Sequence, residues 1–118
     1  MTNKEFAKKL EKRTIDFAIM ILNLCAKLPD TTEAKIVRYQ LAKAGTSVGA
    51  NYREANWGRS KADFKSRIGI SESESSESAY WLEIISRMKW LEENEVIPAL
   101  TEAKELLAIF TSIGNNTK

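Results

Sequence analysis

The spacing of apolar side chains is the feature that most restricts how this chain can fold. Apolar residues recur at steps of three and four along most of the sequence, the spacing that places them on one face of an α-helix. Only five glycines and two prolines occur among the 118 residues, so few positions can interrupt a helix. The pattern predicts an all-α fold without a sheet.

The first two breaks in the pattern predict where two helices begin and end. A first helix is expected from about residue 4 to residue 28, because Pro29 disfavours helical geometry in the residue before it. Asp30 and Glu33 have the spacing of a capping box and are expected to begin a second helix. That helix should end near Gly58, a residue suited to a left-handed position after a helix.

Polar caps predict two further helices. Ser60, followed by Asp63, can cap a third helix that continues to about residue 92. Asn94 can cap a fourth helix, which tolerates Pro98 in its first turn and ends at Gly114.

Residues 71–82, SESESSESAYWL, have the composition of an acidic linker before an apolar anchor. At steps of four and three, however, the stripe of the third helix consists of Phe64, Ile68, Ser71, Ser75, Ser78, Leu82 and Ile85. With no Gly or Pro from residue 71 to residue 87, the segment is predicted to be helical, with serine hydroxyls bonded to carbonyls one turn earlier. The competing interpretation is a disordered, phosphorylatable segment.

Four helices with short connections predict an antiparallel up-down-up-down four-helix bundle, a single domain over residues 1–118. Some apolar residues fall outside the core stripes, which leaves two interpretations open, a wide core or a subunit interface. The candidate interface residues are Ile15, Ile19 and Leu22 in the first helix and Tyr80 and Trp81 in the third. An interface would make the protein a homo-oligomer.

The residue types argue against an enzyme. The chain has no histidine, which removes the usual general base and the commonest metal ligand. Cys25 lies on an apolar helix, and the carboxylates Glu74 and Glu77 lie on one helix without histidine partners. We therefore expect no catalytic residue, no cofactor and no metal.

Two further observations concern compartment. The single cysteine cannot form an intrachain disulfide, and no secretory signal is recognisable, which gives a cytoplasmic location as the expectation. The longest uninterrupted apolar run, residues 17–22, is far too short to span a membrane.

The charges are distributed unevenly along the predicted bundle. In an up-down bundle the start of the first helix, the turn between the second and third helices, and the chain end share one end of the molecule. Residues 1–13, 52–67 and 112–118 carry a net charge of +7, which leaves −5 on the remainder. We call the positive part the basic end.

A phosphate backbone is the natural ligand of such a surface. The residues predicted to bind nucleic acid are Lys8, Lys12, Arg53, Arg59, Lys61 and Lys65. Tyr52 and Trp57, beside the basic turn, would either stack on bases or cover the core. The alternative interpretation of the basic end is a solvated surface that only keeps the protein soluble.

Three blocks of sequence resemble one known family. They are QLAKAGTSVGANYREA over residues 40–55, SKADF over residues 60–64 and ESAYWL over residues 77–82. In this order and spacing they resemble the bacterial 23S rRNA intervening-sequence proteins. The family often has Lys-Glu-Ala where this chain has Ser73-Glu74-Ser75, so its third helix is less basic.

The resemblance implies a four-helix bundle that assembles into a homopentamer and has no enzymatic activity. It also implies kinship with the accessory variability determinant of diversity-generating retroelements, and so RNA or DNA and a reverse transcriptase as candidate partners. Three function classes follow: a nucleic-acid-binding oligomer, a protein-binding or purely structural oligomer, and, least supported, an enzyme.

A polar residue on a helix seam needs a hydrogen-bonding partner. Asn51 stands in the seam of the second helix, and Glu77 lies next to the stripe of the third. We expect the two side chains to bond to each other.

Overall fold

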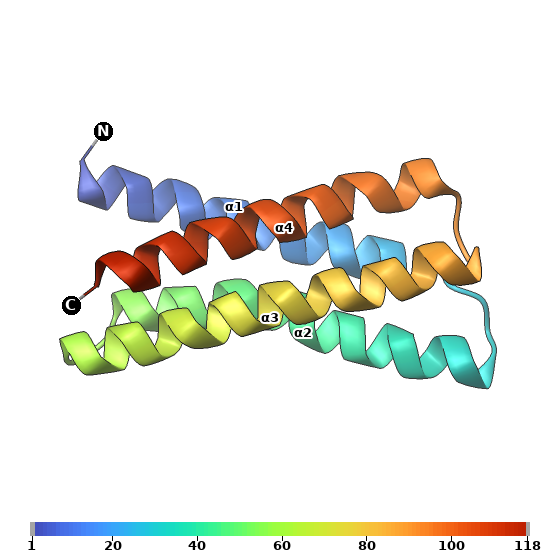
Figure 1. Ribbon diagram of the computed structural model, residues 1–118, viewed down its shortest axis with the longest axis horizontal. Coiled ribbons are helices and arrows are strands. Elements are labelled where there is room, and N and C mark those ends of the chain that lie inside the picture. Colours follow the sequence, from blue (N-terminus) through green and yellow to red (C-terminus); the bar gives the residue numbers. More distant parts are fainter. Residues whose placement is uncertain (1, 118) are drawn as a thin grey trace.

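The computed structural model describes residues 2–117 and consists of four long helices (Figure 1). They are α1 (Asn3–Cys25), α2 (Thr32–Asn56), α3 (Lys61–Met88) and α4 (Glu93–Asn116). Successive helices run in opposite directions, which confirms the predicted all-α up-down-up-down bundle. The bundle is elongated, with principal extents of 44, 25 and 19 Å.

Each helix packs against its neighbours in the sequence, and α1 also makes a smaller contact with α4. Within residues 2–117 the backbones of α1 and α3, and those of α2 and α4, do not come close to each other, so these pairs occupy diagonal positions. The start of α1, the α2–α3 turn and the end of α4 lie at the same end of the bundle, as predicted (Figure 1). Lys118, which was counted with the basic end, lies outside the described residues.

Two of the predicted N-caps are wrong. Asp30 does not cap α2; the Thr31 hydroxyl accepts a hydrogen bond from the Ala34 amide at 3.2 Å, and Asp30 pairs with Lys35. Asn94 does not cap α4, because the N-cap position is Glu92, two residues earlier, and α4 begins at Glu93 without a side-chain cap.

The ends of α2 and α3 also differ from the prediction. Gly58 does not have a positive φ; glycine is needed there because a Cβ would lie 2.8 Å from the Ala55 carbonyl oxygen. α3 ends at Met88 rather than near residue 92, because Lys89 is left-handed (φ 57°, ψ 34°). The amide of Lys89 donates to the Ser86 carbonyl and that of Trp90 to the Ile85 carbonyl, which is a Schellman motif.

One continuous core fills the space between the helices. Its largest fully buried side chains include Phe17, Ile21, Leu41, Ile68, Leu82, Ile85, Leu106 and Phe110. At the basic end it closes with Tyr52 against Phe110, whose ring centroids are 5.4 Å apart. No helix within residues 2–117 is long and apolar enough to cross a membrane.

The serine-rich segment is helical, and Ser71, Ser75 and Ser78 are buried, as predicted. Ser75 and Ser78 donate to carbonyl oxygens four residues earlier at 2.8 Å, which satisfies their hydroxyls within α3. Ser71 differs from the prediction because its hydroxyl donates across to the Val48 carbonyl of α2. The small serine side chains let α3 approach α2 closely, and one of them also joins the two helices.

Candidate nucleic-acid interface

The six basic residues predicted to bind nucleic acid lie at the same end of the bundle, in two groups. Lys8 and Lys12 are one turn apart on α1, and Arg53 belongs to the last turn of α2. Arg59 lies in the α2–α3 turn, with Lys61 and Lys65 in the first turns of α3. All six side chains are exposed. Since α1 and α3 are diagonal, the two groups occupy different sides of this end.

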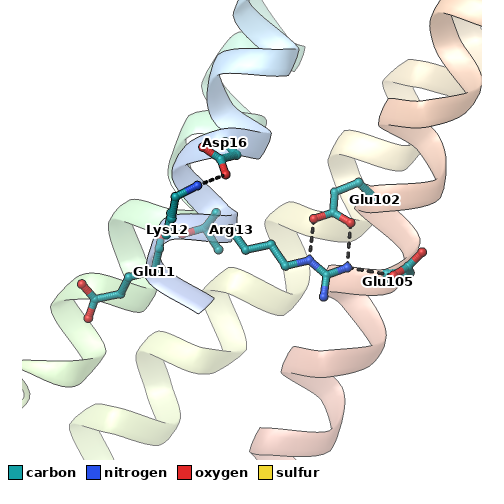
Figure 2. A network of polar contacts seen from close by, with 7 residues as sticks. Glu11, Lys12, Arg13, Asp16, Glu102 and Glu105 are labelled. Carbon is teal, nitrogen blue, oxygen red and sulfur yellow. Dashed lines mark hydrogen bonds and ion pairs between the residues drawn. The ribbon is translucent and has the colours of Figure 1, made fainter. Parts of the chain in front are cut away.

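Carboxylates of the same chain partly neutralise the first group, as Figure 2 shows for α1. Lys12 forms an ion pair of 2.9 Å with Asp16, one turn along α1. Glu11 accepts a hydrogen bond from Asn56 at 2.8 Å and lies 3.9 Å from the Arg53 guanidinium. Ion pairs at the surface stabilise a protein little, so a phosphate can compete with these carboxylates for Lys12 and Arg53.

Arg13 is the basic residue at this end that is most fully engaged within the chain. Its guanidinium reaches from α1 to α4 and binds Glu102 through two nitrogens, at 2.6 and 2.7 Å (Figure 2). A third bond of 2.8 Å joins it to Glu105. The hydrogen bond to Glu102 is the main cause that raises the pKa of Arg13 above its usual value. Arg13 therefore fastens α1 to α4 and adds little to the charge that a ligand meets.

Four of the six predicted residues remain available as cations. Among residues 2–117, Lys8, Arg59, Lys61 and Lys65 make no ion pair with a carboxylate. Three of these belong to the second group, within seven consecutive residues of the α2–α3 turn and the start of α3. That turn therefore carries a compact group of exposed cations that make no ion pair within residues 2–117.

The two aromatic residues near the turn have different surroundings. Tyr52 is buried and covers the core, which confirms one of its two interpretations, and burial raises the pKa of its hydroxyl. Trp57 is 80% exposed and does not cover the core. Trp57 precedes Arg59 by two residues in the chain, and its exposed indole ring is open to a ligand.

A hollow of about 490 Å³ at the basic end was not predicted from the sequence. Its walls are Phe6 of α1, Tyr52 of α2, Phe64 of α3 and Ile113 of α4, with Asn3 and Asn116 at its edge. One sequence signal could have pointed to the hollow. Phe6 and Ile113 stand at opposite ends of the apolar pattern, and an up-down bundle brings these two ends of the chain together.

The candidate interface residues are outside the core, with one exception. Ile15, Ile19 and Leu22 form an exposed apolar stripe on α1, where Ile19 is 52% exposed. Tyr80 is 56% exposed on α3, while Trp81 is half-buried and stacks edge-on against Tyr80. A wide core therefore does not account for the α1 stripe. Cys25 and Leu106 also lie outside the expected core stripes, and a wide core does account for them, because both are buried.

The predicted bond between Asn51 and Glu77 is wrong. The Asn51 amide donates to the Ser47 carbonyl at 2.9 Å, and its oxygen faces Arg67 at 3.5 Å. Glu77 accepts from the Trp81 indole N–H. The acidic residue of α3 that faces α2 is Glu74, beside Ser47; burial and the charge of Glu77 raise its pKa.

The groups considered for catalysis are not arranged for it. Cys25 is buried, its thiol lies 3.7 Å from the Arg38 carbonyl, and burial raises its pKa to about 11 against the opposing charge of Arg38. A thiol with a raised pKa is a poor nucleophile. Among the described residues no three His, Cys, Asp or Glu side chains are placed to hold a metal ion.

Comparison with known proteins identifies relatives over most of the chain. Residues 5–112 match the family model described as 23S rRNA-intervening sequence protein. A crystal structure from Bacteroides thetaiotaomicron, described as a protein of unknown function from the S23 ribosomal protein family, is 30% identical. It superposes with a TM-score of 0.82 over 88% of this chain and 96% of that chain. Comparison with curated proteins gives no significant match.

Proposed function

Because the chain belongs to the 23S rRNA-intervening sequence protein family, we propose that it is a non-enzymatic, homo-oligomeric scaffold that binds nucleic acid through its basic end. One observation carries the proposal: Arg59, Lys61 and Lys65 are exposed, close together in the chain and free of ion pairs within residues 2–117. Lys8 adds a fourth such charge at the same end, and Lys12 and Arg53 can exchange their carboxylate partners for phosphate.

Binding of this kind carries affinity without sequence preference, because contacts to phosphates do not read bases. The affinity for a single-stranded RNA should fall linearly with salt on logarithmic axes, with a slope of about −0.7 for each neutralised phosphate, and about −0.9 for duplex. Fluorescence anisotropy of labelled RNA and DNA over a range of salt concentrations measures the slope. Binding that is absent at low ionic strength, or indifferent to salt, contradicts the proposal.

The oligomer is supported by the two exposed apolar faces. The α1 stripe of Ile15, Ile19 and Leu22 and the α3 face of Tyr80 and Trp81 belong to diagonal helices, so they point in different directions. Contact between unlike faces of neighbouring copies produces a ring if the rotation closes. A ring would place several basic ends side by side and strengthen their common field.

Light scattering should give a mass of several chains for the purified protein, and we propose five times the 13.3 kDa of one chain. Ile19→Glu introduces a charge at the centre of the α1 stripe and is expected to yield monomers. Ile36→Glu is the matched control, because Ile36 is similarly exposed, at 58%, on α2. A monomeric parent protein, or an Ile19→Glu variant that assembles as the parent does, contradicts this part of the proposal.

The second candidate function is a protein-binding or purely structural oligomer. The same exposed apolar faces favour it, because large apolar surfaces mark sites of protein contact. The two candidates differ in one measurement: an oligomer without salt-dependent binding to RNA or DNA belongs to the second class.

A further inference from the structure

The hollow at the basic end has a lining unlike the surface around it. Phe6, Tyr52, Phe64 and Ile113 form apolar walls contributed by all four helices, and no charged residue lines the space. Its volume of about 490 Å³ lies within the roughly 300–1,000 Å³ that is typical of small-molecule sites. Phe6 is 44% exposed and Phe64 is half-buried, so aromatic surface is open to an occupant.

The edge of the hollow is polar but neutral. Asn3 and Asn116, both exposed, can each donate and accept hydrogen bonds through their carboxamides. Asn56 also lines the hollow and is held by its bond to Glu11. Aromatic walls with amides at the edge match a flat heterocycle that carries donors and acceptors on its rim.

Positive charges of α2 and α3 belong to the same helical turns as two of the residues that line this hollow. Lys65 follows Phe64 in the chain, and Lys61 lies three residues before it, on the same side of α3. Arg53 follows Tyr52 in the same way. A ligand with a flat neutral ring and an attached chain of negative charges complements both features together.

We propose that the hollow accepts one unpaired base of a single-stranded nucleic acid whose phosphates lie on Arg59, Lys61 and Lys65. The inference rests on the proposed function and adds the form of the ligand. A duplex cannot present a base in this way without breaking a pair, whereas an unstacked base of a single strand can enter and stack on aromatic side chains. The amides can satisfy more than one base, which agrees with binding that lacks sequence preference.

The test uses the full chain and a short oligouridylate that carries one 2-aminopurine. Binding should change the 2-aminopurine fluorescence, because the base leaves water and stacks on Phe6 and Phe64. Ala7→Trp fills the hollow from one wall and should weaken binding of the oligonucleotide by roughly 5- to 100-fold, the value of one lost base stack. Ala108→Trp is the control, since Ala108 is exposed on α4, outside the hollow and away from the cations of the α2–α3 turn.

A second probe and a second variant separate the possible outcomes. Inorganic polyphosphate has the charges without bases, so Ala7→Trp should leave its binding unchanged. Phe6→Ala removes stacking surface without filling the hollow. It should also weaken binding of the oligonucleotide and leave binding of polyphosphate unchanged. Circular dichroism checks that both variants are helical. If the oligonucleotide and polyphosphate bind the parent but Ala7→Trp and Ala108→Trp behave alike, the base site is refuted and the basic end stands.

If the parent binds neither probe, the proposed function itself fails and the base site with it. A hollow that binds N-acetyltryptophanamide while 2-aminopurine fluorescence stays constant would be a site for an aromatic side chain of a protein, and that result also overturns the proposal.

Discussion

Reversing the charges of Arg59, Lys61 and Lys65 to glutamate together is expected to abolish binding of RNA and DNA. Three cations that are exposed and unpaired among the described residues become anions, and the salt slope for a single strand should lose about two units, at about 0.7 for each phosphate contact. The variant is expected to stay folded, because a negative charge at the N-terminus of α3 interacts favourably with the helix dipole. Fluorescence anisotropy measures the loss of binding, and circular dichroism measures the helical content of the variant.

The control variant carries the same change of charge at the opposite end of the bundle. Lys35, Arg87 and Lys89 are exposed near the start of α2 and the end of α3, and their reversal lowers the net charge by the same amount. This variant should keep most of its affinity. If the two triple variants bind equally, the position of the charge does not matter and the basic end is only a solvated surface.

Replacing Gly49 by alanine is expected to lower the free energy of unfolding by about 1–3 kcal/mol, the cost of overpacking. A Cβ at this position would lie 2.5 Å from the Thr14 hydroxyl oxygen and 2.7 Å from the Thr14 Cβ. Thr14 is buried and its hydroxyl donates to the Glu11 carbonyl, so it has no free direction in which to move. α1 and α2 must therefore separate to admit the methyl group.

Gly69→Ala is the matched substitution in open space. A Cβ there meets no atom within 4 Å, and Gly69 lies inside α3, so alanine should stabilise the protein by about 0.5–1 kcal/mol. Urea unfolding of both variants gives the two differences. If both substitutions stabilise the protein, the close approach of α1 and α2 at Gly49 is absent in solution.

The sequence was sufficient for features that repeat along one helix. The apolar period located four helices and most of the core, and it placed Ser71, Ser75 and Ser78 on the buried side against the composition of the segment. Helix ends were less predictable because single residues decide them. Lys89 ends α3 in a left-handed conformation that glycine or asparagine usually adopts, so the sequence contained no stop signal there.

Pairing between helices depends on their register, which periodicity within one helix does not determine. A shift of one residue turns a side chain by about 100° around the helix. Glu74 therefore faces α2 where Glu77 was expected, and Asn51 bonds within its own helix. The same limit applies to the candidate site. The charged residues could be assigned to one end of the bundle from the sequence, but the hydrogen bonds of Arg13 to Glu102 and Glu105 could not be predicted.

The order of the helices around the bundle has a consequence for the route by which the chain folds. Apart from the smaller contact of α1 with α4, the helix backbones within residues 2–117 approach one another only between neighbours in the sequence, so the mean sequence separation of contacting residues is low. Chains of low contact order cross their folding barrier quickly, because little loop entropy is lost before contacts form. Arg13 is separated from Glu102 by 89 positions in the chain and from Glu105 by 92 positions. Its hydrogen bonds to them therefore form late, once the hairpins between successive helices have brought α1 and α4 together.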